Sequence, residues 1–151
     1  MNQLVFKFPF KKKYFKQDFY VSSNNFSAFK LIESWPKWAG KWLNVFGTSG
    51  SGKTHLSKIL EKKIKKTKVV EAKFIEDNII EKLNNLDCLI IDDYKNNINE
   101  KIFYSILNQS KQLDNYIVIN SVSPVTEFQF ELKDLTSRIN SFVSIGIDLP
   151  T

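Results

Sequence analysis

The sequence predicts a three-layer α/β fold in which helices cover both faces of a mostly parallel, five-stranded sheet. Short apolar runs alternate with segments whose apolar residues recur at helical spacing, which is typical of strands joined by crossover helices. Several runs are apolar almost throughout, as expected for strands buried on both faces. A glycine-rich octapeptide follows the first run and precedes an amphipathic segment, so the order there is strand, loop, helix.

The apolar runs predict the strands, and the segments between them predict helices. The expected strands comprise residues 42–46, 68–72, 88–91, 116–120 and 142–147. The expected helices share apolar residues three or four positions apart; these residues are Phe26, Phe29 and Ile32 within 24–35, then Leu56, Ile59, Leu60 and Ile64, then Ile79, Ile80 and Leu83, and finally Ile102, Phe103, Ile106 and Leu107. Strands and helices in this order favour right-handed crossovers.

The composition is that of one globular domain and excludes several other classes of protein. The chain has 151 residues, 42% of them hydrophobic and 25% charged, and no apolar run reaches the about 18 residues of a membrane-spanning helix. The first basic residues follow a short apolar stretch, the reverse of a secretory signal peptide. One cysteine, Cys88, and one histidine exclude an internal disulfide and a four-ligand zinc site. We therefore expect a cytoplasmic protein with no membrane partner.

The net charge of +6 attracts phosphate groups but does not by itself identify a nucleic-acid partner. Of the 22 basic residues only Arg138 is an arginine, and the others are lysines. Arginine is the usual reader of base edges, so a solvated lysine surface is the simpler explanation. Direct contact with DNA is left open.

The glycine-rich octapeptide predicts a phosphate-binding loop. Its sequence is Gly47-Thr48-Ser49-Gly50-Ser51-Gly52-Lys53-Thr54, which fits the pattern G-x-x-x-x-G-K-[ST] without deviation. Glycines let backbone N–H groups converge on phosphate oxygens, and the following helix directs its positive end at them. Lys53 would bridge the β- and γ-phosphates and Thr54 would ligate Mg²⁺. We therefore expect a P-loop NTPase that binds ATP or ADP with Mg²⁺.

Two consecutive carboxylates at the end of a buried strand complete the predicted metal site. Asp92 and Asp93 directly follow the apolar run that ends at Ile91. Asp92 is positioned to contact the magnesium through water, and Asp93 to orient or deprotonate the attacking water. The alternative is a carboxylate pair that caps the next loop.

Four stretches together resemble the DnaA-type replication initiators of the AAA+ superfamily. They are DFYVSSNN (18–25), FGTSGSGKTHL (46–56), LIIDD (89–93) and DLTSR (134–138). Trp35-Pro36-x-Trp38 and the DLTSR stretch are more similar to the short Hda-type regulators, in particular their α-proteobacterial form. The resemblance implies an AAA+-type sandwich over residues 17–151, in which the small helical lid of the family is missing.

The resemblance also implies functional residues. Arg138 matches the arginine finger that enters the ATP site of a neighbouring subunit, although an arginine that ends a helix and pairs with Asp134 is the alternative. Asn120 matches the sensor that contacts water or the γ-phosphate, but Val122 stands where initiators carry an aspartate. Tyr20 and Val21 correspond to the contacts with adenine.

The N-terminal segment resembles a peptide that binds the DNA polymerase sliding clamp. It contains Gln3, Leu4, Phe6 and Phe8, in which apolar anchors would fill a pocket and the glutamine amide would set the register. Residues 1–16 would then form a tail, and an edge strand packed on the domain itself is the alternative.

These implications define the expected function. The chain would regulate replication initiation, tethered to the clamp, with Arg138 promoting in trans the hydrolysis of ATP bound to a DnaA-type initiator. It would itself be a weak or partner-dependent ATPase, and a homo-oligomer is compatible with this. The alternatives are a nucleotide-binding scaffold without catalysis, an AAA+ helicase loader and a small P-loop kinase.

Overall fold

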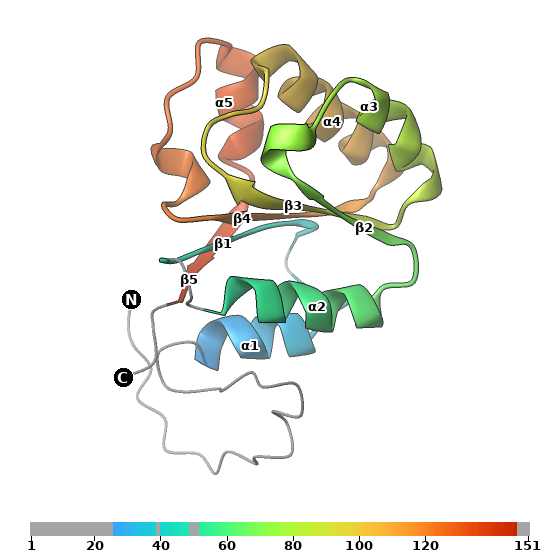
Figure 1. Ribbon diagram of the computed structural model, residues 1–151, viewed down its shortest axis with the longest axis vertical. Coiled ribbons are helices and arrows are strands. Elements are labelled where there is room, and N and C mark those ends of the chain that lie inside the picture. Colours follow the sequence, from blue (N-terminus) through green and yellow to red (C-terminus); the bar gives the residue numbers. More distant parts are fainter. Residues whose placement is uncertain (1–25, 39, 49–51, 148–151) are drawn as a thin grey trace.

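The computed structural model describes residues 26–38, 40–48 and 52–147, and these form one sheet between two layers of helices (Figure 1). The sheet has the strand order β2-β3-β4-β1-β5, and every pairing is parallel. Its strands are β1 (Trp42–Phe46), β2 (Thr67–Glu71), β3 (Cys88–Tyr94), β4 (Tyr116–Ser121) and β5 (Val143–Gly146). The predicted five-stranded α/β sandwich is confirmed.

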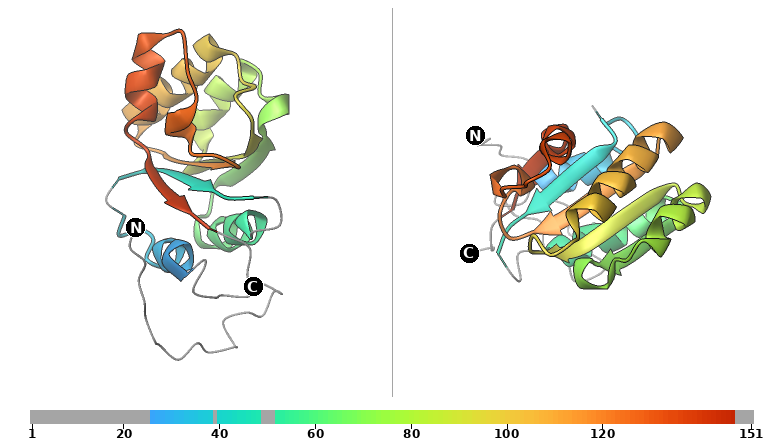
Figure 2. Two further views of the ribbon diagram at one scale, coloured as in Figure 1. Left: turned by 90° about the vertical axis from the view of Figure 1, so that its left-hand side faces the viewer. Right: turned by 90° about the horizontal axis from the view of Figure 1, so that it is seen from above.

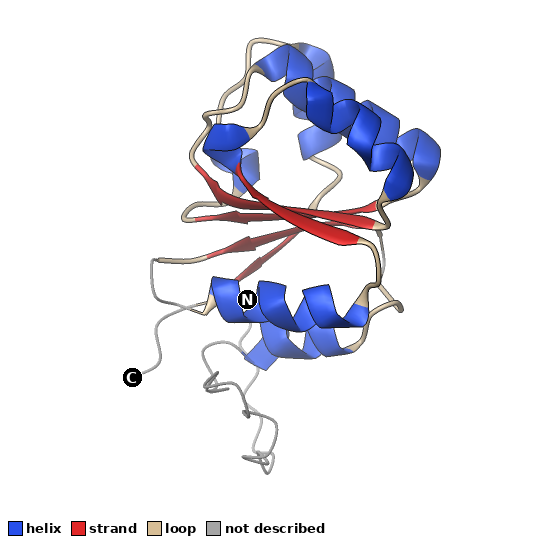
Figure 3. Cartoon of the chain, turned by 45° about the vertical axis from the view of Figure 1, so that its right-hand side comes forward, coloured by secondary structure: helices blue, strands red, loops and turns tan. Residues whose placement is uncertain are grey.

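The helices divide between the two faces of the sheet (Figures 2 and 3). One face carries α1 (Phe26–Glu33) and α2 (Lys53–Lys63), and the other carries α3 (Asn78–Lys82), α4 (Glu100–Leu113) and α5 (Lys133–Ile139). Short 3₁₀ turns comprise Ala72–Phe74, Leu83–Asn85 and Val125–Glu127. None of the helices in the described ranges is long and apolar enough to cross a bilayer.

The residues of β3 show why a continuous apolar run forms a central strand. Leu89 and Ile91 pack into the core beneath α3, α4 and α5, whereas Cys88 and Ile90 pack into the core beside α1 and α2. Successive side chains point to opposite faces, so a strand covered on both sides must be apolar at every position. Burial, reinforced by the neighbouring charge of Asp87, raises the pKa of the Cys88 thiol to about 12, as befits a small buried hydrophobe.

Among the strands, the largest difference from the predicted boundaries lies at the end of β3, and among the helices α5 was not predicted. The strand was expected at residues 88–91 but continues to Tyr94, with a register shift between Ile91 and Tyr94. Two carboxylates interrupt the apolar pattern there, yet Tyr94 is 1% exposed and pairs with Ser121 of β4. A bulge accommodates the polar residues and returns the chain to the sheet.

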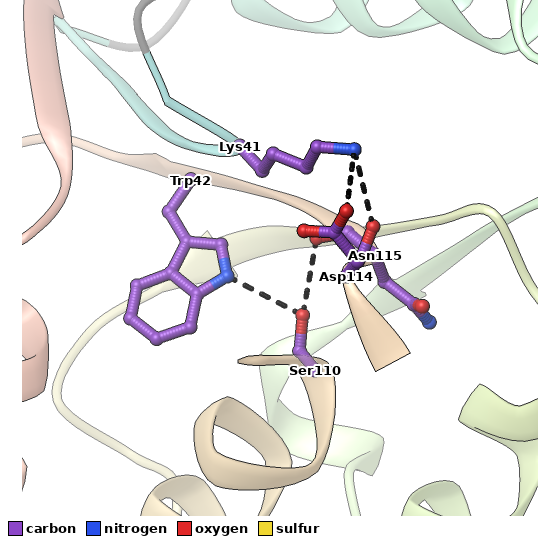
Figure 4. A network of polar contacts seen from close by, with 5 residues as sticks. All are labelled: Lys41, Trp42, Ser110, Asp114 and Asn115. Carbon is purple, nitrogen blue, oxygen red and sulfur yellow. Dashed lines mark hydrogen bonds and ion pairs between the residues drawn. The ribbon is translucent and has the colours of Figure 1, made fainter. Parts of the chain in front are cut away.

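A network of polar contacts lies where β1 and β4 begin (Figure 4). The indole of Trp42 donates to the Ser110 hydroxyl at 3.3 Å, and this hydroxyl donates to the Asn115 carbonyl at 3.2 Å. The ammonium of Lys41 contacts the carboxylate of Asp114 at 3.3 Å. The contacts hold the end of α4 and the start of β4 against the start of β1.

Asn44 is a buried polar residue in the middle of β1, and all its hydrogen-bonding groups are used. Its amide nitrogen donates to the Ile119 carbonyl and the Ser121 hydroxyl, both at 3.0 Å. Its oxygen accepts from the Val125 N–H at 2.9 Å and the Ser144 hydroxyl at 3.3 Å. One side chain thereby joins β4, β5 and the turn after β4 to β1.

We expect Asn44→Ala to lower the free energy of unfolding by about 2–4 kcal/mol, because it leaves buried polar groups without partners. Denaturation by urea measures this loss. Ser144→Ala is the matched control, since it removes only the hydroxyl at the rim and should cost less than about 1 kcal/mol. Equal losses in the two variants would contradict the role of Asn44 as the shared partner.

Candidate functional site

A cleft of about 440 Å³ opens at the carboxyl ends of the strands, beside the start of α2. Parallel pairing places the ends of β2, β3 and β4 at the same edge of the sheet, which is where α/β proteins hold ligands. The residues that line the cleft are Gly52, Lys53, Thr54, His55, Glu71, Asp92, Asp93, Ser121 and Val122.

The ends of the predicted phosphate loop are held by backbone contacts. The N–H of Gly47 donates to the Ser121 carbonyl at 3.0 Å, which continues the pairing of β1 with β4 past Phe46. Gly52 has φ 109°, in the left-handed region, and directly precedes α2. Glycine enters that region without steric cost, so this position turns the loop into the helix. Ser49, Gly50 and Ser51 lie outside the described residues.

Lys53, the first residue of α2, directs its ammonium back over the loop. The ammonium donates to the carbonyls of Gly47 and Thr48, the latter at 3.0 Å. Partial burial lowers the pKa of Lys53, and the charges of Asp92 and Asp93 oppose this shift. The ammonium therefore lies at the loop between backbone oxygens and the two carboxylates, where an anionic ligand would stabilise its charged form.

Asp92 is oriented by two hydrogen bonds to one of its oxygens. The amide of Asn120 donates to Asp92 Oδ1 at 3.2 Å, and the N–H of Asp93 donates to the same oxygen at 3.0 Å. Asn120 also donates to the Ser57 hydroxyl at 2.7 Å, so it joins β4 to both β3 and α2. Asp92 Oδ2 has no hydrogen bond within the described part of the chain and can face a ligand.

Asn120 is 1% exposed and does not line the cleft. Its oxygen is buried and has no hydrogen-bond partner among the described residues. The structure thus places the residue predicted as a sensor behind Asp92, where its amide sets the direction of that carboxylate. Contact between Asn120 and water or a γ-phosphate stays a prediction.

Asp93 lies in the bulge of β3 with a positive φ of 54°. Its carboxylate is exposed at the cleft and forms an ion pair with Lys95 at 3.6 Å. Aspartate tolerates this backbone region better than most residues, and bulges often redirect a side chain next to an active site. Asp92 and Asp93 consequently differ: the first is held by Asn120, and the second lies at the solvent-exposed rim.

The cleft offers part of a magnesium site. Thr54 and Asp92 both line it, and a hydroxyl with a carboxylate suits this hard cation. Within residues 26–38, 40–48 and 52–147, no group of three or more His, Cys, Asp or Glu side chains could hold a metal. Magnesium is commonly bound through one or two protein oxygens plus phosphates and water, so these residues fit a metal that arrives with a nucleotide.

Arg138 lies near the end of α5 and does not line the cleft of its own chain. Its Nη2 donates to Asn108 Oδ1 at 2.9 Å, and its guanidinium lies 5.9 Å from the centre of the Tyr104 ring. Arg138 lies in the last turn of α5, as the alternative has it, and the ion pairs among the described residues do not include one with Asp134.

Besides His55 of the cleft lining, three residues at the site were not found by sequence reasoning. Ser57 lies one helical turn after Lys53 and accepts the hydrogen bond from Asn120. Ser121 follows Asn120 at the end of β4 and binds Gly47. Glu71 ends β2, in register with Asp92, and forms an ion pair with Lys73 at 3.7 Å. The available signal was that Glu71 is the next-to-last residue of the predicted strand 68–72.

Two groups of predicted residues cannot be compared with the structure. Tyr20 and Val21, predicted to contact adenine, lie outside the described residues, as do the predicted clamp contacts Gln3, Leu4, Phe6 and Phe8.

Comparison with known proteins agrees with this architecture. A family model described as RNA helicase matches residues 43–137, and no curated protein sequence matches the chain. The crystal structure of a DNA replication initiation factor aligns with a TM-score of 0.72 at 19% identity, over 89% of this chain and 49% of that one. AMPPCP-bound DnaA from Aquifex aeolicus aligns with a TM-score of 0.69 at 19% identity, over 89% of this chain and 50% of that one.

A shorter relative aligns over more of its own length. Domain III of the Thermotoga maritima replication initiation protein DnaA gives a TM-score of 0.68 at 18% identity, over 95% of this chain and 70% of that one. The chain thus spans about half the length of the two longer proteins. At these identities the alignments show a shared fold, and the predicted AAA+-type P-loop fold of the DnaA proteins is confirmed.

We expect Asn120→Asp to destabilise the protein by about 1–3 kcal/mol at neutral pH, because a second carboxylate would face Asp92. Repulsion between the two carboxylates would raise their pKa values in the folded protein, so the loss should shrink as the pH falls toward about 4 and disappear below it. Urea denaturation at several pH values measures this. Ser57→Ala removes the other partner of Asn120 without adding charge, so its effect should not depend on pH; a pH-independent loss in Asn120→Asp would contradict the assigned contact.

Proposed function

The chain belongs to the RNA helicase family of P-loop proteins, and on that premise we propose that its cleft binds ATP or ADP together with Mg²⁺. The observation that carries the proposal is the convergence of Lys53, Thr54 and Asp92 in one cleft behind the glycine-rich loop. In the bound state the loop amides and the Lys53 ammonium would hold the phosphates. Thr54 would ligate the metal directly and Asp92 through water.

We further propose that the protein is a DnaA-like, Hda-type regulator of replication initiation in the cytoplasm. The structural alignment with a DNA replication initiation factor and with DnaA proteins supports this. Arg138 would enter the nucleotide site of a DnaA-type initiator and promote hydrolysis there. The position of Arg138 on α5, away from its own cleft, supports action on another chain.

The remaining partners follow from the N-terminal segment and from the charge. Gln3, Leu4, Phe6 and Phe8 would tether the protein to the polymerase sliding clamp by filling an apolar pocket. The net charge of +6 would favour contact with the phosphate backbone of DNA. A homo-oligomer would repeat the Arg138 contact between copies.

Hydrolysis by the chain itself would be weak or dependent on a partner. Asp93 is the proposed group that orients or deprotonates the attacking water, and Asn120 acts by directing Asp92. Asp93 is already paired with Lys95 at the exposed rim, which supports a slow reaction until a partner closes the site.

We expect Arg138→Ala to abolish stimulation of initiator-bound ATP hydrolysis, a loss of about 10³-fold or more where an arginine finger operates. Its own nucleotide affinity should be unchanged, because Arg138 does not line the cleft. Release of phosphate from an initiator loaded with radiolabelled ATP measures stimulation, and titration with a fluorescent ADP measures affinity.

Lys53→Ala is the matched control, because it should lose affinity for nucleotide while Arg138 stays in place. Undiminished stimulation by Arg138→Ala would reject the proposed regulation.

The description of the family as RNA helicase provides the second candidate function, ATP-driven separation of nucleic-acid strands. Strand separation by the chain alone, insensitive to Arg138→Ala, would favour that candidate.

A further inference from the structure

Arg138 is held by one face of α4, and the same face holds the segment that leads into α5. The residues of this face are Glu100, Tyr104 and Asn108, which lie four positions apart and therefore on the same side of the helix. The carboxylate of Glu100 accepts from the N–H groups of Glu131 and Leu132 at 2.9 to 3.2 Å. Tyr104 and Asn108 contact the guanidinium of Arg138.

These contacts align α4 and α5 side by side in the same direction on one face of the sheet (Figures 1 and 2). Glu100 and Asn108 are separated by about 12 Å along α4, and Leu132 and Arg138 by about 9 Å along α5, at 1.5 Å per residue. Leu135 and Ile139 are buried in the core beneath α5. The start and the end of α5 are thus both attached to α4, and the backbone that carries Arg138 has a defined position.

The partners of Arg138 orient the guanidinium without neutralising its charge. Asn108 is a neutral amide and accepts one of the five guanidinium N–H donors. Tyr104 presents the face of its ring to the guanidinium, 5.9 Å from the ring centre, and carries no charge there. Within the described residues no carboxylate forms an ion pair with Arg138. An oriented arginine with free donors and an uncompensated charge is suited to a phosphate.

We propose that Tyr104 and Asn108 are positioning residues, which pre-orient Arg138 for the phosphate of a nucleotide bound to another chain. The inference rests on the proposed action of Arg138 in trans. It adds that two residues of α4 make this action efficient. A neutral partner is essential, because a carboxylate at position 108 would form a bidentate ion pair and occupy the donors that the phosphate needs.

The decisive variant is Asn108→Asp, tested with the full chain and an initiator loaded with radiolabelled ATP. We expect its maximal stimulation to fall by about tenfold or more, while its melting temperature is unchanged or higher because an ion pair replaces a neutral hydrogen bond. The chain concentration for half-maximal stimulation should change little, because a positioning role acts on the step at the phosphate and leaves docking of the two chains unaltered.

Tyr104 is tested by a conservative and a disruptive variant. Tyr104→Phe keeps the ring face and should stimulate like the wild type, whereas Tyr104→Leu should lose several-fold in maximal stimulation. Gln112→Asp is the matched control for charge, because it adds a carboxylate to an exposed position of the same helix. It should leave stimulation unchanged.

The outcomes separate this inference from the proposed function. If Arg138→Ala abolishes stimulation but Asn108→Asp and Tyr104→Leu stimulate like the wild type, the positioning role is overturned and the function stands. If Arg138→Ala itself has no effect, both are overturned. Equal losses in Asn108→Asp and Gln112→Asp would also overturn the positioning role, because they would indicate a general effect of charge.

Discussion

Parallel pairing of all five strands is the constraint on which the candidate site depends. Because the strands are parallel, the carboxyl ends of β1, β3 and β4 lie at the same side of the sheet. The start of the phosphate loop, Asp92 and Asn120 are therefore neighbours although they lie far apart in the sequence. The hydrogen bond from Gly47 to the Ser121 carbonyl extends this pairing into the loop itself. The start of the loop at Gly47 is therefore anchored to the sheet without a ligand.

Two buried asparagines hold the strands and the side chains of the site in fixed relative positions. Asn44 joins β1 to β4, β5 and the turn at Val125, and Asn120 joins β4 to Asp92 and Ser57. The two N–H donors of a side-chain amide can bond to two different acceptors, as both asparagines show, and Asn44 uses its oxygen as well. A buried amide left without partners would be costly, which makes each arrangement specific.

The sequence predicted the elements whose signals are local and left the long-range contacts undetermined. The apolar runs identified all five strands, and the spacing of Leu56, Leu60 and Ile64 identified α2, because burial on one face imposes a helical period. The extension of β3 to Tyr94 was missed, since a bulge breaks the alternation that marks a strand. The contact of Arg138 with Asn108 joins residues 30 positions apart, and no local pattern encodes it.

We propose that Asp92 and Thr54 hold a magnesium ion that accompanies the nucleotide. Calorimetric titration with a non-hydrolysable ATP analogue, with and without Mg²⁺, tests it most directly when the wild type is compared with Asp92→Asn. We expect Mg²⁺ to raise the affinity of the wild type by about tenfold or more, equivalent to ~1.4 kcal/mol, and to have little effect on Asp92→Asn. Absence of binding to the wild type, or the same response to Mg²⁺ in both proteins, would contradict the account.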